Sequence, residues 1–320
     1  MWNVLFWILL FIGGYLLIYF AADVFLDNLK ELCLIYKLSP FIIGLLVLGI
    51  DPEESIASII AAINGLPYIA IGNVIGNSIF SLTLCFALPA FFFNINLKSI
   101  SKFYFGILYG CMILLLLSFI FNYGLLIFGL SALILYSIYI IKSLKDASKK
   151  KVIEIKKIGE DIDDEIKNFN KRSKAKKIIL VIIALLFIIL GGEILIYAAE
   201  NLIYLTGISE EIFGFVIIAF VTNVEELTLV FKSVKRGSFE IGLGGMMGKV
   251  IWNLSLTFGI SGVIAIGIKF SQVLIYNWLL LLGLLFYYHG KSKMKTLGKI
   301  DASILMIFLA IFLIVSIVYN

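Results

Sequence analysis

The chain contains ten apolar segments, each long enough to cross a lipid bilayer as a helix. An α-helix needs about 20 predominantly apolar residues to cross the hydrocarbon core. Backbone polar groups find no water in lipid, so only helices and closed barrels of alternating polar and apolar strands can span it. None of the ten segments alternates in that way. The sequence therefore predicts an all-α integral membrane protein with ten transmembrane helices, at residues 3–20, 40–64, 67–93, 104–121, 124–142, 178–198, 211–231, 241–268, 272–288 and 302–319.

The composition agrees with this prediction and excludes several other classes of protein. Of the 320 residues, 62% are hydrophobic and 15% are charged, whereas soluble domains are roughly 45–50% apolar and about 25% charged. The apolar excess is too large for one core, so most of it faces the lipid bilayer. We expect a membrane transporter rather than an enzyme, with no cofactor and no nucleic-acid partner. A monomer and an oligomer both fit the composition.

The basic residues indicate the side of the membrane on which each loop lies. If the N-terminus is outside, 24 of the 26 Lys and Arg residues fall in cytoplasmic loops. Lys269 falls on the outer side, and Lys249 lies within a span. Such an excess of positive charge is typical of cytoplasmic loops and accounts for the net charge of +5. An even number of spans then places both termini outside the cell membrane.

One long polar segment, residues 144–177, separates two groups of five spans. Its apolar residues recur at helical spacing between Ile155 and Phe169, with charged residues on the remaining positions. We interpret the segment as a charged amphipathic linker on the cytoplasmic side. The chain then divides into a first five-helix repeat at 1–143, this linker, and a second five-helix repeat at 178–320.

The two halves carry similar polar motifs at the same spacing. Glu54 is followed 18 residues later by a Gly-Asn-Val-Ile-Gly-Asn stretch at 72–77. Glu226 is followed 18 residues later by Gly-Gly-Met-Met-Gly-Lys at 244–249. Because each half has an odd number of spans, the second half enters the membrane from the opposite side. Inverted repeats of this kind are typical of secondary transporters, whose substrate sites lie near the midplane.

Two carboxylates in the middle of spans are the strongest candidates for a functional site. A charge near the bilayer centre costs several kcal/mol, so such residues are expected to face the protein interior and to serve a function. Glu54 and Glu226 occupy equivalent repeat positions, and Pro52 interrupts the span beside Glu54. A broken helix frees carbonyl oxygens that can bind a cation next to the carboxylates. Glu53 and Glu225 point about 100° away on a helix, and we rank them second.

The motifs around these carboxylates resemble those of the calcium/cation antiporter superfamily, which includes sodium/calcium and calcium/proton exchangers. Its repeats carry Gly-Thr-Ser-x-Pro-Glu followed by Gly-Asn-x-x-Gly-Ser-x-x-x-Asn/Asp. This chain has Gly-Ile-Asp-Pro-Glu-Glu at 49–54 and Val-Thr-Asn-Val-Glu-Glu at 221–226. The resemblance implies a secondary cation antiporter of the sodium/calcium exchanger type, with alternating access around metal-binding Glu54 and Glu226. Calcium, sodium or protons are the implied transported cations, and the implied further ligands are Asp51, Asn77, Ser81, Thr222, Asn223 and Asn253.

The chain departs from the superfamily pattern at a position that bears on the ion. Lys249 stands where the pattern has a small hydroxyl residue. A protonated ammonium donates hydrogen bonds and cannot bind a metal, so we expect it to pair with a carboxylate. Lys249 is then either a switch that frees the carboxylates on deprotonation or a fixed partner that replaces one bound ion. The alternative function is a divergent paralogue that is proton-linked or no longer transports.

Overall fold

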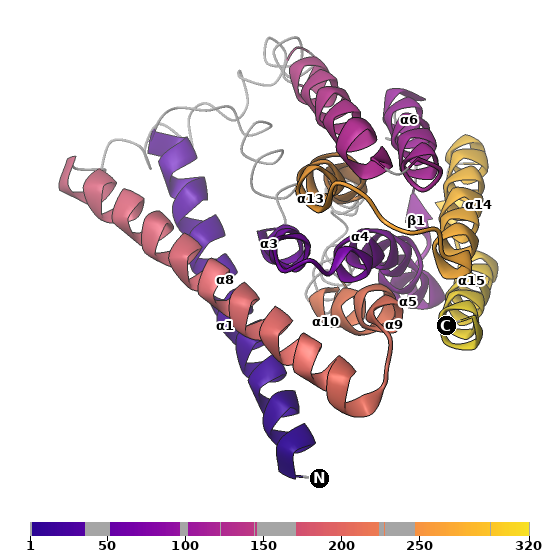
Figure 1. Ribbon diagram of the computed structural model, residues 1–320. Coiled ribbons are helices and arrows are strands. Elements are labelled where there is room, and N and C mark those ends of the chain that lie inside the picture. Colours follow the sequence, from indigo (N-terminus) through magenta and orange to yellow (C-terminus); the bar gives the residue numbers. More distant parts are fainter. Residues whose placement is uncertain are drawn as a thin grey trace, which may run out of the picture.

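The structure is a computed structural model that describes residues 2–35, 52–96, 102–121, 123–143, 145, 171–223, 227, 247–294 and 296–319. Most of these residues are helical (Figure 1). The first half contains α1 (Trp2–Ile35), α3 (Pro52–Ile63), α4 (Pro67–Leu82), α5 (Leu84–Phe92), α6 (Lys102–Ser118) and a helix at Gly124–Ser143. The second half contains α8 (Lys171–Thr206), α9 (Glu210–Ile212), η1 (Phe213–Ile218), α10 (Ala219–Thr222), a helix at 247–252, η2 (Asn253–Thr257), α13 (Phe258–Ala265), α14 (Gln272–Met294) and α15 (Lys299–Val318).

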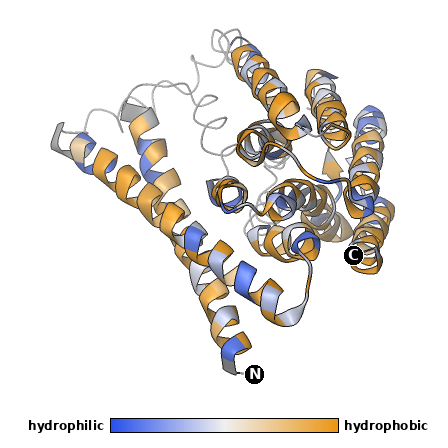
Figure 2. Ribbon diagram, viewed as in Figure 1, coloured by the Kyte–Doolittle hydropathy of each residue, from blue (hydrophilic) through white to orange (hydrophobic). Residues whose placement is uncertain are grey.

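The prediction of a helical membrane protein is confirmed. Within the described residues, seven helices are long and apolar enough to cross a membrane, and α6 is a shorter apolar helix. Figure 2 shows that apolar residues cover most of the length of α1, α8 and α15. The predicted spans 40–64, 211–231 and 241–268 lie partly outside the described residues, so the ten-helix arrangement stays a prediction. One short antiparallel pair of strands, β1 (Ile95–Asn96) with β2 (Thr296–Leu297), was not predicted.

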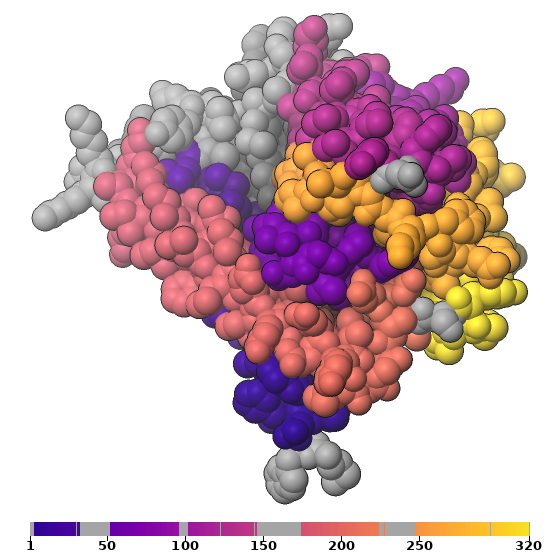
Figure 3. All heavy atoms as spheres, in the orientation of Figure 1, coloured from indigo at the N-terminus to yellow at the C-terminus, as the bar shows by residue number. Residues whose placement is uncertain are grey.

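The two longest helices, α1 and α8, cross each other beside the rest of the bundle (Figure 1). Both are longer than the predicted first and sixth spans, because hydropathy marks the apolar part of a helix and not its polar ends. A Cβ atom on Gly191 would lie 2.9 Å from the carbonyl oxygen of Gly14, so the two backbones touch. Lys177 Nζ also lies 2.6 Å from Glu31 Oε2. The two helices form one unit, and Figure 3 shows that α8 reaches α3 in the bundle.

The helix α4 lies in the middle of the bundle and is buried from Ile69 to Leu82. It packs against α3, η1, α10, α13 and α14, which come from both halves of the chain. Asn73, Asn77 and Ser81 follow each other at intervals of four residues and therefore share one face of α4. The fold thus places a row of polar side chains where neither lipid nor solvent reaches them.

The helices around α4 depart from regular α geometry. The segments η1 and η2 are π-helical, and α4 and α5 are separated at Thr83. The predicted interruption beside Glu54 stays a prediction, because the residues before Pro52 lie outside the described part of the chain. Pro52 itself is the first described residue of α3, and proline fits the first turn of a helix. Single π-helical turns often occur at functional sites, and these irregular segments converge on the polar face of α4.

The contact between α4 and η1 is too close for an added methyl group. A Cβ atom on Gly76 would lie 2.1 Å from the carbonyl oxygen of Phe215, and one on Gly72 would lie 3.1 Å from its amide nitrogen. Glycines of this kind allow helix backbones inside a membrane to approach closely. The close approach brings the polar face of α4 within hydrogen-bonding distance of the second half of the chain.

We expect Gly76→Ala to force α4 and η1 apart and to destabilise the folded protein. Overpacking costs typically about 1–3 kcal/mol, and a clash with backbone is harder to relieve than one with a flexible side chain. The measurement is the thermal unfolding temperature of the purified protein in detergent. Gly106→Ala in α6 is the matched control, because nothing lies within 4 Å of its Cβ position. Equal unfolding temperatures for the two variants would contradict the close backbone contact between α4 and η1 at Gly76.

Candidate functional site

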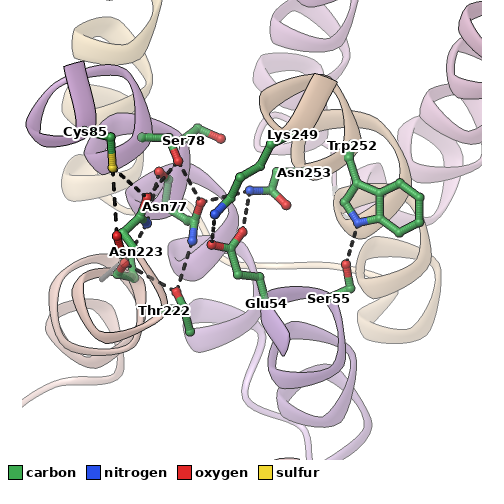
Figure 4. Close-up of polar contacts among 12 residues, drawn as sticks. Glu54, Ser55, Asn77, Ser78, Cys85, Thr222, Asn223, Lys249, Trp252 and Asn253 are labelled. Atoms are coloured by element: carbon green, nitrogen blue, oxygen red, sulfur yellow. Dashed lines mark hydrogen bonds and ion pairs between the residues drawn. The ribbon is translucent and has the colours of Figure 1, made fainter. Parts of the chain in front are cut away.

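Seven residues predicted for the site lie together inside the bundle, and Figure 4 shows the polar contacts among most of them. Each is at most 4% exposed: Glu54, Asn77, Ser81, Thr222, Asn223, Lys249 and Asn253. Glu53 is also buried, at 3% exposed. Asp51, Glu225 and Glu226 lie outside the described residues, so their places in the site stay predictions.

The Glu54 carboxylate lies at the centre of this group and is contacted at both oxygens. The start of α3 at Pro52 places Glu54 in the first turn of that helix. Lys249 Nζ lies 2.6 Å from Glu54 Oε1, and Asn253 Nδ2 donates a hydrogen bond to Glu54 Oε2 at 2.8 Å. Lys249 and Asn253 are four residues apart, so both reach the carboxylate from one side. A first-half carboxylate is thus held by second-half side chains.

Asn77 connects this carboxylate to the end of α10. Asn253 Nδ2 donates to Asn77 Oδ1 at 3.0 Å, and Asn77 Nδ2 donates to Thr222 Oγ1 at 3.0 Å. The Thr222 hydroxyl in turn donates to the carbonyl oxygen of Ile218 at 3.1 Å. A continuous chain of hydrogen bonds therefore runs from Glu54 through α4 to α10.

Ser81 and Asn223 form the other end of the network. Ser81 Oγ donates to Asn223 Oδ1 at 2.8 Å, and Asn223 Nδ2 donates to the carbonyl oxygen of Ala219 at 2.8 Å. Cys85 Sγ lies 3.7 Å from Asn223 Oδ1. Asn223 follows the last residue of α10, so its side chain points across to α4 and α5. These three contacting side chains are all neutral in their usual states.

Asn73 and Ser58 belong to the surroundings of Glu54 and were not predicted for the site. Asn73 Nδ2 donates to Ser58 Oγ at 2.9 Å and to the carbonyl oxygen of Glu54 at 3.3 Å. These bonds hold the first turn of α3 against α4. The sequence contained a usable signal, because Asn73 lies four residues before Asn77 on the same helix face.

A second unpredicted group lies on the other side of Glu54. Ser55 Oγ lies 2.7 Å from Thr257 Oγ1, and Trp252 Nε1 donates to Ser55 Oγ at 2.7 Å. Thr257 follows Asn253 by one turn of η2, so the same segment contacts α3 twice. A single Ser or Thr in an apolar helix gives no sequence signal that separates a site residue from an ordinary packing contact.

Because the ion pair of Glu54 and Lys249 is buried, both its desolvation cost and its electrostatic attraction are large. Their side chains are 1% and 5% exposed, respectively. Moving an ion out of water costs several kcal/mol, which is recovered only by good geometry and by further hydrogen bonds. The hydrogen bond from Asn253 supplies such a contact to the remaining Glu54 oxygen. Glu54 and Lys249 therefore stabilise each other's charge in an environment where lipid offers no polar partner.

The oxygen atoms of the site are suitable ligands for a hard cation. Sodium-like and calcium-like ions prefer carboxylate, amide and hydroxyl oxygens, which Glu54, Asn77, Ser81 and Thr222 provide. Asn253 Oδ1 is buried and accepts no hydrogen bond from the part of the chain that the structure describes. A cation that binds Glu54 Oε1 has to displace the Lys249 ammonium or share the carboxylate with it. At this oxygen, binding of a cation would therefore be an exchange of partners and not the filling of an empty cage.

Helices long and apolar enough to cross a membrane enclose this buried polar centre, an arrangement typical of membrane transporters. The chain belongs to the sodium/calcium exchanger protein family, whose sequence profile matches residues 6–144 and 176–318. This match confirms the resemblance drawn from the repeat motifs. It also confirms a multi-pass protein of the membrane.

Individual relatives agree with the family assignment. An uncharacterized membrane protein of Methanocaldococcus jannaschii is 28% identical over 312 residues, which are 95% of this chain and 95% of that protein. The inner membrane protein YrbG of Escherichia coli is 24% identical over 271 residues, which are 81% of this chain and 80% of YrbG. The solved structure of the sodium-calcium exchanger NCX_Mj soaked with 2.5 mM Na⁺ and 10 mM Sr²⁺ has a TM-score of 0.60 and 21% identity. The match covers 97% of this chain and 98% of that chain, so the whole fold is similar.

We expect a double-mutant cycle to detect strong coupling between Glu54 and Lys249. Removing one partner of a buried ion pair typically costs about 3–5 kcal/mol, because the other charge stays buried without compensation. Glu54→Gln and Lys249→Met should therefore each lower the unfolding temperature in detergent more than the variant with both changes.

The pair of Lys177 and Glu31 is the matched control for this cycle. Its side chains are 21% and 35% exposed, and ion pairs with such access to solvent contribute typically about 0–1 kcal/mol. Lys177→Met and Glu31→Gln should therefore show little coupling. Additive losses for Glu54 and Lys249, as in this control, would contradict the buried ion pair.

Proposed function

We propose that the protein is a secondary cation antiporter that binds its ions around Glu54 and exposes them alternately to the two sides of the membrane. The proposal rests on one observation, the buried network that links Glu54, through Asn253 and Asn77, to amide and hydroxyl groups from the other half of the chain. The family makes sodium and calcium the expected transported ions. The carboxylates of Glu54 and Glu226 supply the charge, and the proposed further ligands are Asp51, Asn77, Ser81, Thr222, Asn223 and Asn253.

The inverted-repeat arrangement is part of this proposal. Position 77 is the repeat counterpart of position 249, and position 81 is the counterpart of 253. All four side chains belong to the network around Glu54, which supports two halves that face each other across the site. The proposed topology places both termini outside and residues 144–177 in the cytoplasm, as the basic residues predict.

Sliding of α1 and α8 is the proposed movement that changes access to the site. These helices pack mainly on each other and meet the other described helices chiefly through α3, which carries Glu54. A unit with few attachments can move without breaking the network between α3, α4 and η2. Domain motions of this kind convert an outward-facing into an inward-facing transporter.

A second candidate function is a paralogue that keeps the fold and no longer transports. The contact between Lys249 and Glu54 favours it, because the ammonium takes one oxygen of the central carboxylate. We prefer the antiporter, because Asn253 Oδ1 and the other oxygens of the network still suit a cation. Cation-dependent flux separates the two functions.

We expect Glu226→Gln to abolish sodium-gradient-driven uptake of radioactive calcium in proteoliposomes. An amide cannot supply the negative charge with which a carboxylate neutralises a divalent cation. Glu193→Gln is the matched control, since Glu193 is an exposed carboxylate on α8 and should tolerate the change. Unchanged uptake in Glu226→Gln would refute its assignment, and no uptake by the parent protein would favour the non-transporting paralogue.

A further inference from the structure

The side chain of Lys249 ends inside the site and not at a membrane surface. It is 4% exposed, and its ammonium lies 2.6 Å from Glu54 Oε1. Oxygens bind calcium at about 2.3–2.6 Å, so the ammonium occupies nearly the position that a cation on this oxygen would take. Figure 4 shows the Lys249 side chain pointing at the carboxylate from the helix that precedes Asn253.

Lys249 is the positively charged side chain that the structure places on the Glu54 carboxylate. Apart from Glu54 and Lys249, the residues labelled in Figure 4 are amides, hydroxyls, a thiol and an indole. Asn253 donates to the second Glu54 oxygen but brings no charge. The ammonium therefore does for Glu54 what a bound monovalent cation does for a carboxylate in such a site.

The two halves of the chain differ at this position. The repeat counterpart of Lys249 is Asn77, a neutral amide that hydrogen-bonds to Thr222 and Asn253. The replacement of a cation by a side chain is therefore confined to one half. A lysine is also tethered through its stem, so it stays with its helix while a dissolved ion leaves during each cycle.

We propose that Lys249 is a built-in cation: its ammonium fills one monovalent-cation position at Glu54, so each transport cycle binds and moves one monovalent cation fewer than the same site with a neutral side chain at 249. This inference rests on the proposed antiport function, because it names the coupling ratio of that site. It requires no change in the protonation of Lys249 during transport.

A binding experiment tests the replacement without relying on transport. Thermal unfolding of the detergent-purified parent, Lys249→Ser and Lys293→Ser is measured against sodium, lithium and potassium chloride. N-methylglucamine chloride keeps the ionic strength constant, and exposed Lys293 controls for the loss of one positive charge. Any ligand that binds the folded state alone raises the unfolding temperature with its concentration.

We expect Lys249→Ser to gain a saturable stabilisation by one small monovalent cation that the parent and Lys293→Ser lack. A Lys249→Ser protein that folds only when such a cation is present also supports the proposal. The same cation dependence in all three proteins overturns it. Failure of Lys249→Ser to fold in any of these salts overturns it as well, because the ammonium would then not be replaceable by an ion.

A transport experiment tests the coupling ratio itself. The reversal potential of sodium-dependent calcium flux in proteoliposomes gives the number of sodium ions moved with each calcium ion. We expect Lys249→Ser to move one sodium ion more than the parent, and Lys249→Arg, which keeps the charge, to match the parent. Equal ratios in parent and Lys249→Ser overturn the inference. No sodium-dependent calcium flux in the parent contradicts the proposed function instead, and the binding experiment then decides the role of Lys249.

Discussion

Polar groups inside this bundle must find their partners within the protein, because lipid offers none. A buried hydrogen-bonding group without a partner costs several kcal/mol in such an environment. The hydrogen bonds of the network around Glu54 form only because helix backbones approach closely, as Gly76 and Phe215 do. The glycines of α4, the breaks in the neighbouring helices and the polar face of α4 therefore form one arrangement. Each of these three features would destabilise the folded protein without the other two.

The same requirement shapes how a cation can bind. In the structure several site oxygens are contacted by protein donors, among them the Lys249 ammonium and the side-chain amides of Asn77 and Asn253. In the proposed transport cycle, a cation replaces some of the amide and hydroxyl donors, and these donors return when it leaves. The free-energy difference between the cation-bound and the cation-free site is then small. It is smaller than the interaction energy of the site oxygens with either the cation or the returning donors. A transporter needs such a balance, because it must release the ion that it binds.

Much of the site could be predicted from the sequence because charges in apolar spans are rare. Glu54 was identified from the repeat register, and the residues at 77, 81 and 253 from the family resemblance; the structure places them in one network. The sequence contained no comparable signal for Ser55, Thr257 and Trp252, which look like ordinary packing residues. Nor could it show which carboxylate Lys249 meets, because that depends on the distance between α3 and η2.

The fold, like the site, could be predicted in large part from the sequence, and for similar reasons. Hydropathy identified the apolar part of each described span but not the full length of α1 and α8, whose polar ends pair outside the apolar region through Lys177 and Glu31. The π-helical segments depend on tertiary contacts with α4, so periodicity could not reveal them.

In the inverted-repeat transporter proposed above, Lys249 also affects the relative stability of the two conformations. Exchanging the conformations of the two halves gives states of equal energy only where equivalent positions carry equivalent chemistry. Positions 77 and 249 do not, since one is a neutral amide and the other an ammonium paired with Glu54. The ion pair stabilises the conformation in which the helix at 247–252 lies against α3. Without bound ions, the protein should therefore favour that conformation over its inverted counterpart.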